Sequence, residues 1–174
     1  IVKRQITHLS RLVDDLLDVS RITQGRIELQ RRPVELADVI AQAMESVEPL
    51  MRERRHRVFV ASSYEPLYVD GDSARLVQCL SNILTNSAKY TDSGGEIRIE
   101  ERAESGWAVV SITDNGVGIP QELLPQIFDL FVQSDRSLDR SLGRLGIGLS
   151  MVQRLIEMHG GFVSASSPGP GHGS

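Results

Sequence analysis

The chain has 174 residues, a hydrophobic content of 40% and a formal net charge of −4 at pH 7. A chain of this size can bury one substantial core plus an appendage. The negative charge argues against nucleic acid as a partner, and the single cysteine, Cys79, excludes an internal disulfide and a cysteine-based zinc site. No apolar run approaches the roughly 20 residues that span a bilayer. We therefore expect a soluble, cytoplasmic piece of chain, whether or not its parent protein is anchored in a membrane.

The first predicted element is a helix over residues 1 to about 24. Its apolar side chains recur at alternating spacings of four and three, which is the pattern of a coiled-coil seam. These side chains are Val2, Ile6, Leu9, Val13 and Leu16. Gln24-Gly25 breaks the pattern, and Arg31-Arg32-Pro33 closes a short linker. We therefore divide the chain into a partial dimerisation helix with its linker over residues 1–32 and a folded domain over residues 33–174.

The folded domain contains helices and strands without strict alternation. An amphipathic helix begins near Leu36, and a second helix is predicted over residues 73–90, with Asp72 at its N-cap position. A third helix is predicted over residues 146–159. Strands are predicted over residues 56–61, 67–69, 96–102, 107–113 and 161–165. The strands over 96–102 and 107–113 are predicted to form an antiparallel hairpin with Ile97 and Ile99 directed inward. This mixture predicts an α+β fold of two layers, and the tail from Ser167 is predicted to be a flexible end or turn.

The helix over residues 73–90 carries a polar stripe. At about 100° per residue, Asn82, Asn86, Lys89 and Tyr90 gather opposite an apolar face. Amide oxygens can bind a hard cation such as Mg²⁺, an ammonium group can meet a phosphate, and an aromatic ring can pack against a base or ribose. The simpler alternative is a polar helix surface exposed to water.

A strand end followed by glycines is the second candidate feature. Asp114 follows the predicted strand over residues 107–113, and Gly116, Gly118 and Ile119 come next. The carboxylate can accept a hydrogen bond from a flat heterocycle, and glycines let the backbone approach a ligand closely. Such a sequence also makes ordinary turns, so this motif alone is a weak signal.

A second glycine cluster opens the predicted helix over residues 146–159. Gly143, Gly146 and Gly148 stand before or at its start, followed by Leu149. Glycines at a helix start leave backbone N–H groups able to face an anion, and the helix dipole adds attraction. A dinucleotide-binding fold would need a hydrophobic strand directly before the glycines, but residues 133–141 are polar. The sequence therefore predicts a phosphate-binding loop outside a Rossmann fold.

Taken in order, these motifs resemble the catalytic and ATP-binding domain of sensor histidine kinases, a GHKL or Bergerat-type ATP-binding fold. Residues 82–90 resemble the N box of this family, 114–118 its G1 box, 128–131 its F box and 143–149 its G2 box. The resemblance covers nearly the whole chain, because residues 69–72 and 158–161 also fit the family. Residues 13–20 are similar to the second helix of the family's dimerisation and phosphoacceptor domain. It implies a two-layer α/β sandwich preceded by a long helix through which the intact protein forms a homodimer.

The resemblance also implies a reaction, namely phosphoryl transfer from MgATP to a histidine, for signal transduction to a response regulator receiver domain. Asn82 would polarise the γ-phosphate or orient the imidazole, Asn86 would bind Mg²⁺, and Asp114 would accept a hydrogen bond from adenine. The other implied ATP-binding residues are Lys89, Tyr90, Gly116, Gly118, Ile119, Gly143, Gly146, Gly148 and Leu149. Phe128 and Phe131 would anchor the loop over the site, and Arg136 and Arg140 would reach the triphosphate when this loop closes. Where Arg144 stands the family usually has a glycine, and the family pattern would continue into one more strand after Ser174.

None of the four histidines fits the family's phosphoacceptor, which is followed by an acid and, a few residues later, by proline. His8 lies outside the seam of the first helix, His56 starts a predicted strand, His159 ends a predicted helix and His172 lies in the tail. We therefore expect the acceptor histidine on a helix that precedes Ile1, in the same or a partner kinase chain. The fragment alone would then be unable to autophosphorylate.

Two other classes remain open. Topoisomerase, mismatch-repair and chaperone ATPases of the same fold resemble one another in a glutamate that activates water. The matching position here is Asn82, an amide that cannot act as a general base. A serine kinase acting on anti-sigma partners would lack the N-terminal helix. The second class is a non-enzyme, either a nucleotide-sensing dimerisation module or a degenerate kinase in which Arg144 has abolished turnover.

Overall fold

The computed structural model describes residues 28–132 and 146–174. The predicted helix over residues 1–24, and with it the predicted dimerisation unit, lies outside the described residues. Gly143, Arg144 and the polar loop before them lie outside as well. Within the described ranges, no helix is both long and apolar enough to cross a membrane.

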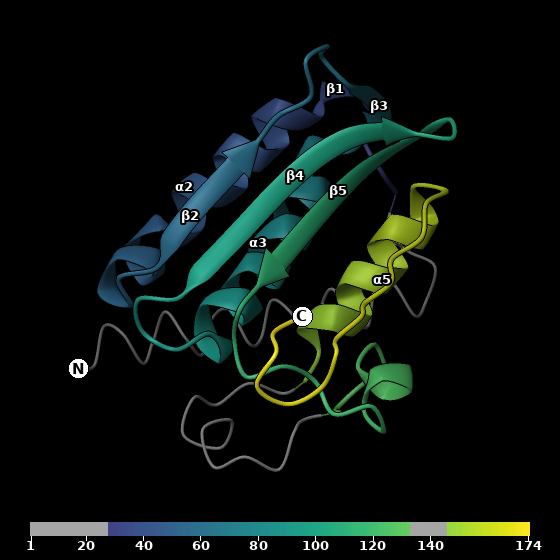
Figure 1. Ribbon diagram of the computed structural model, residues 1–174. Coiled ribbons are helices and arrows are strands. Elements are labelled where there is room, and N and C mark those ends of the chain that lie inside the picture. The colour runs from purple at the N-terminus through teal and green to yellow at the C-terminus, as the bar shows by residue number, and fades with distance from the viewer. Residues whose placement is uncertain (1–27, 133–145) are drawn as a thin grey trace, which may run out of the picture.

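The domain is a sheet covered on one face by helices (Figure 1). The main sheet has three strands in the order β2 (Arg57–Ala61), β4 (Glu96–Glu104) and β5 (Trp107–Asp114). β4 and β5 form the predicted antiparallel hairpin, whereas β2 pairs parallel to β4. Two long helices, α2 (Leu36–Glu53) and α3 (Ser73–Tyr90), lie behind this sheet in the view of Figure 1. The predicted two-layer α+β fold is confirmed.

A second, smaller sheet pairs β1 (Arg32–Glu35) with β3 (Tyr68–Gly71) in antiparallel register, with Val34 opposite Val69. We predicted β3 within a few residues but missed β1, because Arg32 and Pro33 were assigned to the linker. Proline lacks an N–H group and is accepted in short edge strands. Pro33 therefore does not prevent this strand from forming.

The core lies between the helix layer and the sheet. Its buried side chains come from α2, α3 and β4: Ile40, Ala43, Val47, Met51, Leu84, Ala88, Ile97 and Ile99. The predicted inward direction of Ile97 and Ile99 is confirmed, with exposures of 0% and 1%. The predicted N-cap of α3 is also confirmed, because a carboxylate oxygen of Asp72 accepts a hydrogen bond from the backbone N–H of Arg75.

A second buried cluster joins α3 to α5 (Gly148–Met158), and it contains Cys79, Met151, Val152 and Leu155. Burial raises the pKa of the Cys79 thiol to about 12, so this group stays protonated and packs as a small apolar side chain. The cluster makes α3 and α5 one packed pair.

The predicted strand over residues 161–165 is wrong. These residues leave α5 and run alongside it without entering a strand (Figure 1). Alternating apolar residues form a strand only where a neighbouring backbone supplies hydrogen bonds. In the described part of the chain, β5 ends the sheet and pairs only with β4.

Candidate functional site

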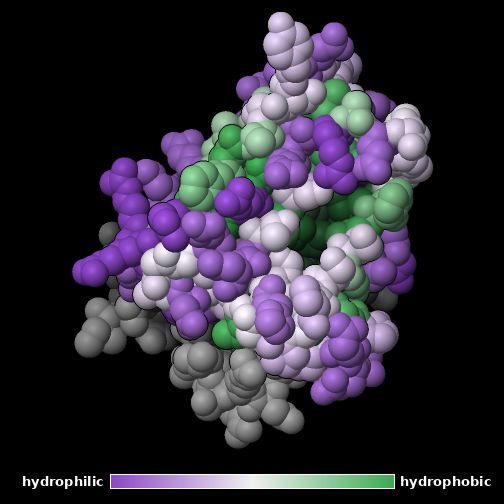
Figure 2. Space-filling view, viewed as in Figure 1, coloured by the Kyte–Doolittle hydropathy of each residue, from purple (hydrophilic) through white to green (hydrophobic). Residues whose placement is uncertain are grey.

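A cavity of about 1210 Å³ runs along α3, β5 and α5, and its lining extends to Arg31, Asp70 and His159 at the far end of these helices. Figure 2 shows it as a hollow with hydrophobic residues on its floor. Most predicted binding residues line this one cavity: Asn86, Lys89, Tyr90, Asp114, Gly118, Ile119, Gly146, Gly148 and Leu149. They come from the end of α3, the end of β5 and the start of α5. The fold therefore brings together three motifs that are far apart in the sequence.

Asp114 ends β5 and is only 9% exposed. One of its carboxylate oxygens accepts a hydrogen bond from the backbone N–H of Gly116 at 2.9 Å. The other accepts one from the Ser174 hydroxyl at 2.9 Å. These bonds orient the carboxylate at the cavity wall, and an ionised carboxylate has about four acceptor sites, so it retains capacity for a ligand donor.

The loop after Asp114 packs tightly against the end of α3. The backbone N–H of Val117 donates to the Tyr90 carbonyl at 2.8 Å. A Cβ atom added to Gly116 would lie 2.3 Å from that same carbonyl oxygen. Gly116 does not line the cavity, so the structure explains this glycine by the packing of the protein on itself.

The tail was predicted to be a flexible end or a turn, and it forms a turn, at residues 170–171, that packs against the site. The Ser167 hydroxyl oxygen accepts a hydrogen bond from the Ile119 N–H at 2.9 Å. Asp114 and Ser174 exchange two backbone hydrogen bonds, of 2.9 and 3.3 Å, as in an antiparallel pair. Sequence reasoning therefore missed Ser174 as a neighbour of Asp114. The available signal was the run of glycines at 169, 171 and 173, all of which have positive φ.

The side chain of Asn82 lies beside the start of α5. A Cβ atom added to Gly148 would lie 3.7 Å from the Asn82 side-chain oxygen. The Asn82 amide nitrogen is buried and has no hydrogen-bond partner among the described residues. Buried polar atoms without partners are uncommon in folded proteins. Asn82 is not among the residues that line the cavity, but its unpaired donor lies beside Gly148, which does line it.

The start of α5 adds further donors to the same corner. Ile147 occupies the N-cap position and makes no side-chain capping bond. The first backbone N–H groups of a helix have no partner within the helix, and its N-terminus attracts negative charge. Gly146 has a φ of 68° and a backbone that approaches Val132, which favours glycine at this position.

The end of α3 supplies the remaining predicted groups. Asn86 and Lys89 are half-buried, and Tyr90 is 36% exposed. Phe128, predicted to anchor the loop over the site, lines the cavity, whereas Phe131 is 61% exposed. Among the residues with described positions, no three histidine, cysteine, aspartate or glutamate side chains form a group that could hold a metal ion. Arg136, Arg140 and Gly143 lie outside the described residues.

The model of the histidine kinase-, DNA gyrase B-, and HSP90-like ATPase family matches residues 71–174. The chain belongs to this family. It is 33% identical over 206 residues to the hybrid signal transduction histidine kinase D of Dictyostelium discoideum, covering 99% of this chain and 13% of that protein. It is 32% identical to the circadian input-output histidine kinase CikA of Synechococcus elongatus, covering 92% of this chain and 22% of that protein.

Solved structures agree with this assignment. Full-length ShkA, crystallised with AMPPNP, matches 95% of this chain and 34% of its own length, with a TM-score of 0.80 and 30% identity. The histidine kinase AdeS of Acinetobacter baumannii has the same fold, with a TM-score of 0.78 over 96% of this chain and 76% of its own. The chain therefore carries the catalytic and ATP-binding domain of a sensor histidine kinase. It spans only 13% and 22% of the two curated relatives described above.

Proposed function

We propose that this domain transfers the γ-phosphate of ATP to a histidine imidazole on a helix of the same or a partner kinase chain. The observation that carries the proposal is the buried, unpaired amide nitrogen of Asn82 beside the start of α5. Phosphoryl transfer needs little covalent help from the protein, so oriented donors near the phosphates are the expected machinery. Asn82 would polarise the γ-phosphate or orient the attacking imidazole.

In this proposal ATP lies along the cavity with its base at Asp114. The carboxylate would accept a hydrogen bond from the adenine amino group, and Tyr90, Gly118 and Ile119 would border the base and ribose. Lys89 would contact phosphate. Backbone N–H groups at Gly143, Gly146, Gly148 and Leu149 would face the phosphates at the uncapped start of α5.

The donor set fits Mg²⁺ bound mainly through the nucleotide. Mg²⁺ is commonly held by few protein groups, with phosphate oxygens and water completing its octahedron. The side-chain oxygen of Asn86, on the wall of the cavity, is the protein ligand that we propose. The ion would neutralise part of the charge on the triphosphate.

We further propose that the parent protein is a cytoplasmic or membrane-anchored kinase that signals to a response regulator receiver domain. ThkA, which is 24% identical to this chain, has been crystallised in complex with the response regulator protein TrrA. Homodimerisation would use the helix predicted over residues 1–24. The fragment alone, without an acceptor histidine, would bind ATP and not label itself.

Phosphotransfer to an added acceptor-helix domain tests the proposal. With radiolabelled ATP, we expect the wild-type fragment to label the histidine. Asn82→Ala should slow labelling by about 100-fold, the order found when one oriented donor is removed from an active site. Asn86→Ala should remove the Mg²⁺ dependence of ATP binding in calorimetry. Gln126→Ala removes a similar amide from the exposed surface of the short 3-10 helix Leu124–Gln126 and serves as the control.

Two results would contradict this mechanism. Unchanged labelling by Asn82→Ala would remove the role assigned to its amide. ATP binding by the wild type without any labelling of the histidine would favour the nucleotide-sensing alternative.

A further inference from the structure

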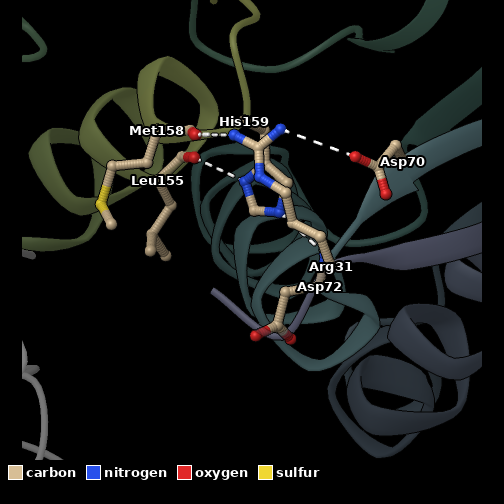
Figure 3. Close-up of polar contacts among 6 residues, drawn as sticks. All are labelled: Arg31, Asp70, Asp72, Leu155, Met158 and His159. Carbon is tan, nitrogen blue, oxygen red and sulfur yellow. Dashed lines mark hydrogen bonds and ion pairs between the residues drawn. The ribbon is translucent and has the colours of Figure 1, made fainter. Parts of the chain in front are cut away.

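Polar groups from three separate parts of the chain meet where α3 begins and α5 ends (Figure 3). Gln30 and Arg31 belong to the segment that leads into β1, Asp72 is the N-cap of α3, and His159 is the C-cap of α5. These four residues form what we call the junction latch.

His159 uses both ring nitrogens to join α5 to α3. The backbone N–H of Asp72 donates to His159 Nε2 at 3.0 Å. Because that N–H can only donate, Nε2 must be the acceptor and the ring proton lies on Nδ1. Nδ1 then donates to the Leu155 carbonyl oxygen, which lies 2.7 Å away. The ring is therefore a neutral imidazole held as one tautomer.

The segment that leads into β1 is bonded to the ends of α3 and α5 at two points. The backbone N–H of Gln30 donates to the Asp72 carboxylate at 3.0 Å. The Arg31 guanidinium donates to the Met158 carbonyl at the end of α5, where the helix dipole favours a cation. A second guanidinium nitrogen of Arg31 lies 3.8 Å from the carboxylate of Asp70, an exposed ion pair that adds little.

The latch is too far from the phosphates to act on them directly. Asp72 precedes the first residue of α3, whereas Asn86 and Tyr90 belong to its last turns. Asn82, the residue proposed to act on the γ-phosphate, follows Asp72 by ten positions, which is about 15 Å at the usual helical rise. Any effect of the latch on phosphoryl transfer must therefore pass through the position of the whole domain.

We propose that Arg31 and His159 are positioning residues, which clamp the segment entering β1 and so set the orientation of the ATP-binding domain relative to the helix that carries the acceptor histidine. This role rests on the proposed phosphotransfer function. Two tethers on consecutive residues, one to α3 and one to α5, fix both the position and the direction of the chain where it enters the domain. The energetic reason is pre-organisation, because a held domain presents ATP to the imidazole more often than a loosely tethered one.

Amide hydrogen exchange tests the clamp without reference to catalysis. In His159→Leu we expect the amides of Asp72 and Gln30 to exchange at least 10-fold faster than in the wild type. His159→Gln places an acceptor near the position of Nε2 and should restore slow exchange. Arg154→Ala removes an exposed arginine from the same helix and is the matched control. Unchanged exchange in His159→Leu would overturn the latch, provided that the Cys79 amide in the middle of α3 shows that the fold is intact.

The kinetics of the kinase chain that includes the acceptor helix test the positioning role. Arg31→Ala and His159→Leu should lower kcat about 5-fold or more and leave the KM for ATP unchanged, with recovery in His159→Gln. Unchanged kcat, or a parallel loss of ATP affinity, would overturn the role. Failure of the wild type to transfer phosphate would overturn the proposed function itself. The hydrogen-exchange experiment does not depend on catalysis, so it tests the latch independently of that function.

Discussion

The two ends of the α3–α5 pair differ in how their polar groups are satisfied. At the latch, both carboxylate oxygens of Asp72 and both ring nitrogens of His159 have protein partners. At the other end, the Asn82 amide nitrogen is buried without one among the described residues, and α5 starts without a side-chain cap. Polar groups at a structural junction bond to other groups of the protein, whereas a binding site contains donors whose partner is the ligand. The latch is therefore a structural polar cluster, whereas the Asn82 end of the same two helices has the features of a ligand site.

The largest expected effect comes from the close backbone packing at the nucleotide end. Gly116→Ala would place a methyl group 2.3 Å from the Tyr90 carbonyl oxygen and should lower the free energy of unfolding by about 3 kcal/mol. Gly106→Ala is the control, because this glycine has a φ of 83° and nothing within 4 Å of the added carbon. Backbone strain alone should cost about 1 kcal/mol there. Urea denaturation measures both, and equal losses would contradict the packing explanation of Gly116.

Asp114→Asn should weaken ATP binding at the nucleotide end of the α3–α5 pair. The variant keeps an oxygen for the Gly116 N–H but loses the charged acceptor proposed for adenine. We expect ATP binding to weaken by about 2 kcal/mol, or about 30-fold, in calorimetry. Asp70→Asn removes a carboxylate at the latch end and should leave the dissociation constant unchanged. Equal ATP affinity in Asp114→Asn and the wild type would refute the adenine assignment.

Substitution of Asp72, at the latch end, should change the stability of the domain and leave its ATP affinity unchanged. Asp72→Ala removes the N-cap of α3 and the bond from Gln30, and should cost about 1.5 kcal/mol of unfolding free energy. Asp72→Asn keeps a capping oxygen and should cost less. A changed ATP dissociation constant in either variant would show that the two ends are not independent.

The stabilisation by Asp72 should also depend on pH. Burial raises the pKa of its carboxyl, but backbone hydrogen bonds from Gln30, Arg75 and Ala74 outweigh burial, and the net pKa is lowered. A lowered pKa in the folded state stabilises the protein above the unfolded value of about 3.9, and this contribution is lost as pH falls through the folded value. The stability difference between the wild type and Asp72→Asn should therefore shrink below about pH 4. A constant difference in urea denaturation down to pH 3 would contradict the charge effect.

The smallest expected effect concerns residues 161–165, which follow the latch. Phe162 meets Trp107 of β5 edge to face, with ring centroids 5.3 Å apart and planes at 79°. Phe162→Ala should lower the unfolding free energy by about 1 kcal/mol and shift the emission of the single tryptophan. Phe162→Leu keeps apolar contact without the ring and should fall in between. An unchanged emission spectrum in Phe162→Ala would indicate that this segment is held by other contacts.

Prediction from the sequence succeeded where a feature depends on neighbouring residues. The bounds of α3 and its N-cap at Asp72 follow from helical periodicity and capping chemistry, both of which act within a few residues. The inward direction of Ile97 and Ile99 follows from strand alternation. The strand predicted over residues 161–165 does not form. Alternation is a local pattern, and it does not show whether a neighbouring backbone is present for the strand to pair with.

The order and residue types of the motifs were enough to predict a histidine kinase-like ATP-binding domain. The reason is that the residues that bind the ligand lie within short segments of the sequence. The folded structure was needed to show which glycines serve packing, that the tail pairs with Asp114, and that His159 bonds to Asp72. Those contacts join residues far apart along the chain, 87 positions in the case of His159 and Asp72. Local sequence preferences act over a few residues, so pairings at such separations are selected by the packing of the whole domain.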